Sequence, residues 1–188
     1  MASVIQRQNQ LVNRQSELAR LEETWVKTMA GRPQLVMVWG RRRVGKTFLL
    51  AHFVRGKRAV FFGATQQAEV VELARLAETV RRDLGPRAAD LTGGTFSSWE
   101  AALRFFVALA ADEPLIVVLD EVPYLARSTA GFASIVQAVW DHVPPSTKLC
   151  LILTGSAVGV IEDMLGARAV LRGRPTLAMR LDPLGPTE

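Results

Sequence analysis

The amino-acid sequence predicts a three-layer α/β domain, in which helices cover both faces of a parallel β-sheet. Four short runs are apolar at consecutive positions, which is typical of strands buried on both faces. Segments with apolar residues at spacings of three and four separate these runs, as in amphipathic helices. Alternation of such strands and helices favours the α/β class. The expected strands are Leu35–Trp39, Ala59–Phe62, Leu115–Leu119 and Leu149–Leu153, with a weaker fifth candidate at Thr176–Leu181.

The first predicted helix precedes the first strand. Leu18, Leu21 and Trp25 repeat at helical spacing, and charged residues occupy most other positions. Asn13 is a suitable N-cap, and the segment Gly31-Arg32-Pro33 is a suitable stop. Five further helices are expected. They run from Gly45 to about Arg55, over roughly Ala68–Leu84, from after Ser97 or Ser98 to near Asp112, from about Gly131 to Trp140 and around Val158–Leu165.

Composition excludes several classes of protein. The 188 residues are 49% hydrophobic, which suits one domain with its own core and excludes a wholly disordered chain. One cysteine and two histidines exclude a disulfide framework and argue against a zinc site. The sequence shows no secretory signal and no apolar run long enough for a membrane span, so we expect a cytoplasmic protein without a membrane partner.

Charge is unevenly distributed along the chain. Residues 1–60 carry a net charge of +9, whereas residues 61–188 carry −4. A basic half can indicate a nucleic-acid partner. Here a single basic loop accounts for much of the excess, so the charge alone leaves nucleic-acid binding open.

That loop carries the strongest motif of the sequence. Gly40–Thr47 reads Gly-Arg-Arg-Arg-Val-Gly-Lys-Thr and matches the phosphate-binding pattern G-x-x-x-x-G-K-[ST] between a strand and a helix. Its glycines let successive N–H groups face phosphate oxygens, at the positive end of the next helix. Lys46 is expected to reach the β- and γ-phosphates during catalysis, and the Thr47 hydroxyl to ligate Mg²⁺. The predicted nucleotide contacts here are Gly40, Arg41, Arg42, Arg43, Val44, Gly45, Lys46, Thr47 and Phe48.

The three arginines of the loop leave more than one interpretation open. Arg41, Arg42 and Arg43 can touch phosphate, remain solvated or contact a partner subunit.

Two acidic residues follow the third predicted strand. In open α/β sheets, ligands bind at the carboxyl ends of the strands, where Asp120 and Glu121 would lie. Asp120 is expected to hold Mg²⁺ directly or through water, and Glu121 to polarise the attacking water. The alternative is a solvated acidic turn.

The fourth strand also ends in polar residues. Thr154 or Ser156 would face the γ-phosphate if this strand lies between the first and the third, and such a group can report phosphate loss. Ser156 can equally be an ordinary N-cap of the next helix.

These motifs together resemble the archaeal-type ATPase family, in the AAA+/STAND branch of P-loop NTPases. The resemblance rests on blocks that occur in the family's order over nearly the whole chain. They are Val12-Asn13-Arg14 with Glu17, Leu18 and Leu21, the loop Gly40–Thr47, Leu119-Asp120-Glu121 with Pro123-Tyr124-Leu125, Leu153–Ser156, and Gly173-Arg174.

The resemblance implies a five-stranded sheet of order 5-1-4-3-2 and the ligands ATP or ADP with Mg²⁺. It implies that Asn13 and Arg14 line the adenine pocket, and that Arg174 acts as an arginine finger or sensor, in the same chain or from a neighbour. Arg174 can instead be a surface arginine after a glycine turn. Residues 1–32 would then complete the core on the adenine side, 33–182 would form the ATPase domain, and 183–188 would begin a linker.

The family usually continues into a helical lid and a winged-helix module, which these residues do not include. Because lids complete such sites, we expect slow turnover. The hypotheses that follow are a slow Mg-dependent ATPase, a nucleotide-gated switch with negligible turnover, a small-molecule kinase and a nucleic-acid binder. The Asp120-Glu121 pair argues against the kinase. Self-association through a shared nucleotide site also stays open.

Overall fold

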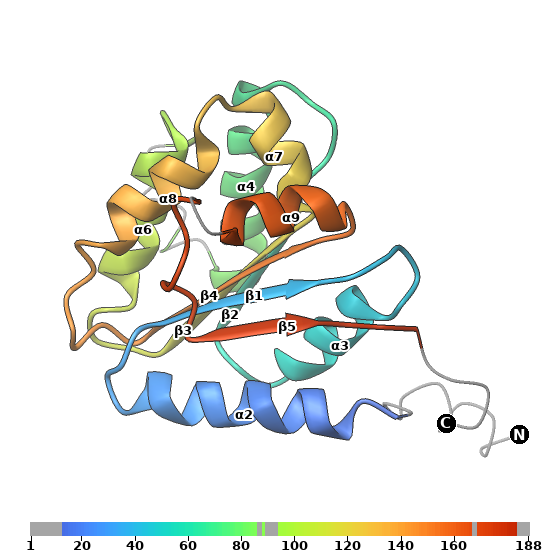
Figure 1. Ribbon diagram of the computed structural model, residues 1–188. Coiled ribbons are helices and arrows are strands. Elements are labelled where there is room, and N and C mark those ends of the chain that lie inside the picture. Colours follow the sequence, from blue (N-terminus) through green and yellow to red (C-terminus); the bar gives the residue numbers. More distant parts are fainter. Residues whose placement is uncertain (1–12, 86–87, 89–93, 167–168, 184–188) are drawn as a thin grey trace, which may run out of the picture.

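The fold is a parallel β-sheet between two layers of helices (Figure 1). The computed structural model describes residues 13–85, 88, 94–166 and 169–183. Its five strands lie in the order β2-β3-β4-β1-β5, and every pairing is parallel. Read from the other edge, this is the predicted order 5-1-4-3-2, so the fold class is confirmed. The strands are β1 (Gln34–Trp39), β2 (Ala59–Gly63), β3 (Leu115–Asp120), β4 (Leu149–Gly155) and β5 (Leu177–Arg180).

The helices divide between the two faces of the sheet. Figure 1 shows α2 and α3 on one face and the other labelled helices on the opposite face. The bounds are α2 (Gln15–Met29), α3 (Lys46–Phe53), α4 (Glu69–Leu84), α6 (Trp99–Leu109), α7 (Val122–Ser128), α8 (Phe132–Trp140) and α9 (Val158–Leu165). None of the helices in the described ranges combines the length and apolar character that a membrane crossing requires.

Alternate strand residues build two separate cores. On β4, for example, Leu151 and Leu153 face the core beneath α4, α6 and α8, whereas Ile152 faces the core beneath α2 and α3. Side chains of a strand alternate between the faces of its sheet, so a strand covered on both sides must be apolar throughout. All seven residues of β4 are buried, as the continuous apolar run predicts.

The first helix begins one residue later than predicted. Arg14, rather than Asn13, is the N-cap of α2, and its side chain makes no capping hydrogen bond. Asn13 has a left-handed backbone with φ of 59°, a conformation that asparagine tolerates better than most residues. The predicted helix start after Ser97 or Ser98 is confirmed, because Ser98 is the N-cap of α6 and its hydroxyl accepts from the N–H of Ala101.

Helix α7 is absent from the sequence prediction. It has only seven residues and begins after Glu121, whose backbone is left-handed with φ of 58°. Pro123 lies in its first turn, where a helix tolerates a residue without an N–H. Because a proline usually indicates a helix boundary, the sequence around Pro123 did not predict a helix.

Some predictions fall on residues outside the described ranges. These are Val12 of the N-terminal block and residues 184–188 of the expected linker.

Candidate nucleotide site

The predicted phosphate loop connects β1 to α3 at the carboxyl edge of the sheet. Strand β1 lies between β4 and β5, Thr154 is the penultimate residue of β4, and Asp120 ends β3 on the far side of β4. The chain leads from β1 to β2 on one side of this point and from β4 to β5 on the other side. Open α/β sheets bind ligands where the direction of the connections changes in this way. The loop forms one wall of a cleft of about 410 Å³. The lining residues are Arg42, Arg43, Gly45, Lys46, Thr47, Phe48, Glu121 and Tyr124.

Two glycines shape the loop, but for different reasons. Gly40 has φ of 153°, and a Cβ atom there would lie 2.2 Å from the carbonyl oxygen of Leu181. Gly45 has φ of 91°, in the left-handed region, although a Cβ atom there would meet nothing within 4 Å. Gly40 is therefore required by close packing against the end of β5, and Gly45 by the backbone turn into α3.

Lys46 is the first residue of α3, and its side chain extends back across the phosphate loop. Its Nζ donates to the carbonyl oxygens of Gly40 at 2.8 Å and Arg41 at 3.0 Å. Burial lowers the pKa of the Lys46 ammonium from its usual value, and the carboxylates of Glu121 and Asp120 oppose that shift. A partly desolvated cation that faces a cleft is well placed to bind an anion.

Thr47, which lines the cleft, brings its hydroxyl next to a carboxylate oxygen of Asp120. The Thr47 hydroxyl donates to Asp120 Oδ2 at 2.7 Å, and the N–H of Glu121 donates to Asp120 Oδ1 at 3.0 Å. Burial raises the pKa of Asp120, and the hydrogen bond from Thr47 opposes it. The nearby negative charge of Glu121 adds to the increase.

Glu121 is held by the end of β4. Its Oε2 accepts hydrogen bonds from the N–H of Ser156 at 3.1 Å and from the Ser156 hydroxyl at 2.9 Å. Ser156 thus contacts the predicted base rather than capping α9, whose N-cap is Ala157. The sequence predicted Ser156 as a phosphate sensor or a cap, and it gave no signal for this contact across 35 positions of the chain.

Thr154 is completely buried near the end of β4 and faces the α3 side of the sheet, as Ile152 does. Its Oγ1 has no hydrogen-bond partner among the described residues. Buried hydroxyls without a partner are rare and often occur at functional sites.

The N-terminal segment reaches the other side of the loop. The buried Arg14 guanidinium donates to the Val44 carbonyl at 3.1 Å and to the Asp182 carbonyl at 2.5 Å. A second cavity of about 330 Å³ lies against the loop. It is lined by Arg41, Arg42, Arg43, Val44, Gly45 and Pro183. The structure therefore brings the Arg14 side chain to the loop, while the adenine-pocket role of Asn13 and Arg14 stays a prediction.

Arg174 does not join this site within the chain. It lies before β5, where the N–H of Thr176 bonds the carbonyl of Leu35 at the start of β1. The strands are parallel, so Arg174 is at the opposite edge of the sheet from the phosphate loop. Its guanidinium instead forms two hydrogen bonds with Asp141, at 2.7 and 2.8 Å. An arginine finger in the same chain is thus a wrong prediction for this residue.

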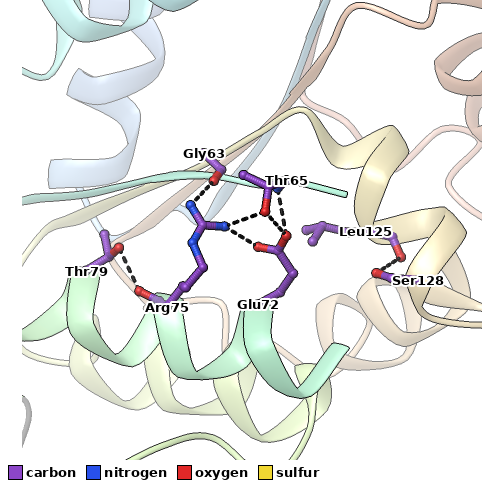
Figure 2. Close-up of polar contacts among 7 residues, drawn as sticks. All are labelled: Gly63, Thr65, Glu72, Arg75, Thr79, Leu125 and Ser128. Carbon is purple, nitrogen blue, oxygen red and sulfur yellow. Dashed lines mark hydrogen bonds and ion pairs between the residues drawn. The ribbon is translucent and has the colours of Figure 1, made fainter. Parts of the chain in front are cut away.

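A buried carboxylate beside the site gave no signal in the sequence. Figure 2 shows Glu72 of α4 between Thr65 and Arg75, at the end of β2. Glu72 is completely buried and accepts from the Thr65 N–H at 2.8 Å and from Arg75 at 2.6 Å. Arg75 also donates to the Gly63 carbonyl, and Gly63 pairs with Asp120 across the sheet. This network fixes the turn after β2 next to the acidic end of β3.

Some cations of the basic N-terminal half are paired with acids in the part of the chain that the structure describes. Lys27, Lys57 and Arg58 form ion pairs with Glu23, Glu22 and Glu113, respectively.

Residues 11–186 match the family described as an ATPase domain predominantly from Archaea. The chain belongs to this family of ATPase domains. An uncharacterized protein of Methanocaldococcus jannaschii is 27% identical over 174 residues, which cover 92% of this chain and 36% of that protein. The chain thus spans about a third of the length of this curated relative.

Two solved structures share the fold. The Walker-type ATPase of Pyrococcus abyssi is similar with a TM-score of 0.69 and 22% identity, over 94% of this chain and 55% of the other. The ORC2 protein of Aeropyrum pernix, solved as ADPNP and ADP complexes, has a TM-score of 0.65 and 18% identity, over 92% and 48%. At these identities the likeness concerns the fold.

Proposed function

We propose that this domain binds Mg-ATP and hydrolyses it slowly, with Glu121 as the general base. The observation that carries this proposal is that Glu121 lines the same cleft as Lys46 and Thr47. A carboxylate beside a phosphate-binding loop is suited to accept a proton from water that attacks the γ-phosphate. The two hydrogen bonds from Ser156 would keep that carboxylate oriented.

The oxygens of Thr47 and Asp120 fit a magnesium ion. Thr47 and Asp120 supply a hydroxyl and a carboxylate oxygen only 2.7 Å apart, and Mg²⁺ prefers such oxygen ligands. When bound, the ion would neutralise charge on the phosphates. Lys46 would exchange its contacts with the loop carbonyls for the β- and γ-phosphates, because a charged acceptor competes well with neutral carbonyls.

The remaining assignments follow from position around the loop. Asn13 and Arg14 would lie on the adenine side, since Arg14 contacts Val44 from there. Thr154 would sense the γ-phosphate from the buried end of β4, where its hydroxyl has no described partner. Arg174 would have a structural role through Asp141.

A single-turnover experiment tests the role of Glu121. With protein in excess over labelled Mg-ATP, we expect the wild type to release phosphate and Glu121→Gln to lose at least about 100-fold in rate while ATP stays bound. Glutamine keeps the shape of the side chain but cannot accept the proton. Asp163→Asn, an exposed acid on α9, is the matched control and should behave like the wild type.

Two outcomes would contradict the proposal in different ways. Equal and negligible cleavage in both proteins, with ATP bound, would support the alternative of a nucleotide-gated switch. Absence of ATP binding by the wild type would instead refute the assignment of Lys46 and its loop.

A further inference from the structure

Among the three loop arginines, Arg42 makes a contact that distinguishes it. Its Nη2 donates to the hydroxyl of Tyr124 at 2.7 Å, across 82 positions of the chain. Both side chains line the cleft that also contains Lys46 and Glu121. The positive charge of Arg42 adds to the effect of burial, which is the main cause of the lowered pKa of Lys46. The Arg42 guanidinium therefore faces the same space as the Lys46 ammonium.

Tyr124 connects this contact to the proposed base. It lies on α7, and its N–H donates to the carbonyl of Glu121 at 2.9 Å. The contact between Arg42 and Tyr124 thus joins the phosphate loop to the helix that begins directly after Glu121.

Arg42 also differs from other arginines of the fold in its partner. Arg14, Arg75 and Arg174 each form an ion pair with a carboxylate. Within the described residues, Arg42 has no carboxylate within 4.0 Å and donates to a neutral phenol. A phosphate with several negative charges binds guanidinium more strongly than a phenol does, so Arg42 can leave Tyr124 when such a group enters the cleft.

We infer that Arg42 is a catalytic arginine supplied by the chain's own phosphate loop, and that Tyr124 positions it before nucleotide binds. This inference rests on the proposed ATP hydrolysis. A water oxygen forms a bond to the γ-phosphorus, the bond from that phosphorus to the β-γ bridging oxygen breaks, and Glu121 takes the proton, which yields ADP and phosphate. Arg42 stabilises the negative charge on the γ-phosphoryl oxygens during this exchange.

The kinetic test separates catalysis from binding. We expect Arg42→Gln to slow single-turnover cleavage at saturating Mg-ATP about 100-fold, and to weaken ATP binding less than about fivefold. Arg127→Gln, an exposed arginine on α7, is the matched control and should change neither quantity. An unchanged rate at saturating ATP, with weaker binding, would make Arg42 a ground-state contact and overturn the inference.

The positioning role of Tyr124 has its own signature. Tyr124→Phe removes only the hydroxyl, so it should leave the saturating rate within about threefold and tighten ATP binding about two- to fivefold, because Arg42 no longer exchanges one partner for another. A large loss of rate with unchanged affinity would contradict this role.

A spectroscopic test does not depend on turnover. Tyr124 is the single tyrosine of the chain, so protein grown with 3-fluorotyrosine gives one ¹⁹F resonance from this side chain. We expect ADP to leave that resonance near its nucleotide-free position. ADP with aluminium fluoride, which mimics the transferring phosphoryl group, should move it toward the position seen in nucleotide-free Arg42→Gln.

The two tests distinguish failure of this inference from failure of the proposed function. If the wild type binds ATP without cleaving it, the proposed hydrolysis fails, and the fluorine shift alone decides whether Arg42 leaves Tyr124 for the γ-position. If the aluminium fluoride complex forms and the resonance stays at its ADP position, the inference is overturned whatever the rate of hydrolysis.

Discussion

Asp120 shows at the level of one residue how the site opposes stability. It is buried at the end of β3, and that burial raises its pKa because the ionised carboxylate loses water. The hydrogen bonds from Thr47 and from the N–H of Glu121 compensate only in part. The pair of oxygens that suits a divalent cation therefore lowers the stability of the folded protein when no ligand is bound.

Replacement of Asp120 should therefore stabilise the protein when no nucleotide is bound. We expect Asp120→Asn to raise the free energy of unfolding at pH 7 by about 1 kcal/mol, measured by urea denaturation without nucleotide. A carboxyl whose pKa is raised by folding destabilises the fold increasingly as pH rises from the unfolded pKa to the folded one. The gain should consequently shrink as pH falls, and it should vanish below the usual value of 3.8, where both states are protonated. A gain that grows toward acid pH would contradict this account.

At the level of elements, the sequence predicted strands well and side-chain partners poorly. Each continuous apolar run forms a strand, because the side chains on both faces of a covered strand are buried and therefore apolar. The loop Gly40–Thr47 was also predictable, since the phosphate-binding pattern is local. Helix α7 was missed because it is short and contains Pro123. The contact of Ser156 with Glu121 depends on how β4 lies beside β3, which no local pattern encodes.

The two loop glycines give a prediction about the connection from β1 to α3. Gly40→Ala should lower the free energy of unfolding by about 3 kcal/mol, because the new methyl group would overlap the backbone of Leu181. Gly45→Ala has open space and bears only the strain of a left-handed backbone, about 1 kcal/mol. Chemical denaturation of both variants gives the comparison. Equal losses would show that the end of β5 does not constrain the loop.

At the level of the whole molecule, Arg14 links distant parts of the chain at the phosphate loop. It belongs to the start of α2, yet it bonds the carbonyl of Val44 in the loop and that of Asp182 after β5. Glu17 holds the guanidinium through an ion pair at 2.6 Å. Secondary structure does not supply these contacts, so one buried side chain closes the domain at this point.

Loss of the Arg14 side chain should lower the stability of the fold. We expect Arg14→Ala to lower the free energy of unfolding by about 2 kcal/mol, because the Val44 and Asp182 carbonyls lose a charged donor. Arg20→Ala, at an exposed position of the same helix, should change it by less than about 0.5 kcal/mol. Thermal unfolding of the two variants measures the difference, and similar values for both would refute the role of Arg14.

The position of Arg14 has a mechanical consequence. Residues 14 and 182 are 168 positions apart, yet one guanidinium holds both ends of the fold against the same turn of backbone. A pull on the chain at either end would reach the phosphate loop through this side chain, and a pull on the C-terminal end would also reach it through the hydrogen bond from the Leu181 N–H to the Trp39 carbonyl. Force applied outside the domain and occupancy of its cleft would then act on each other directly.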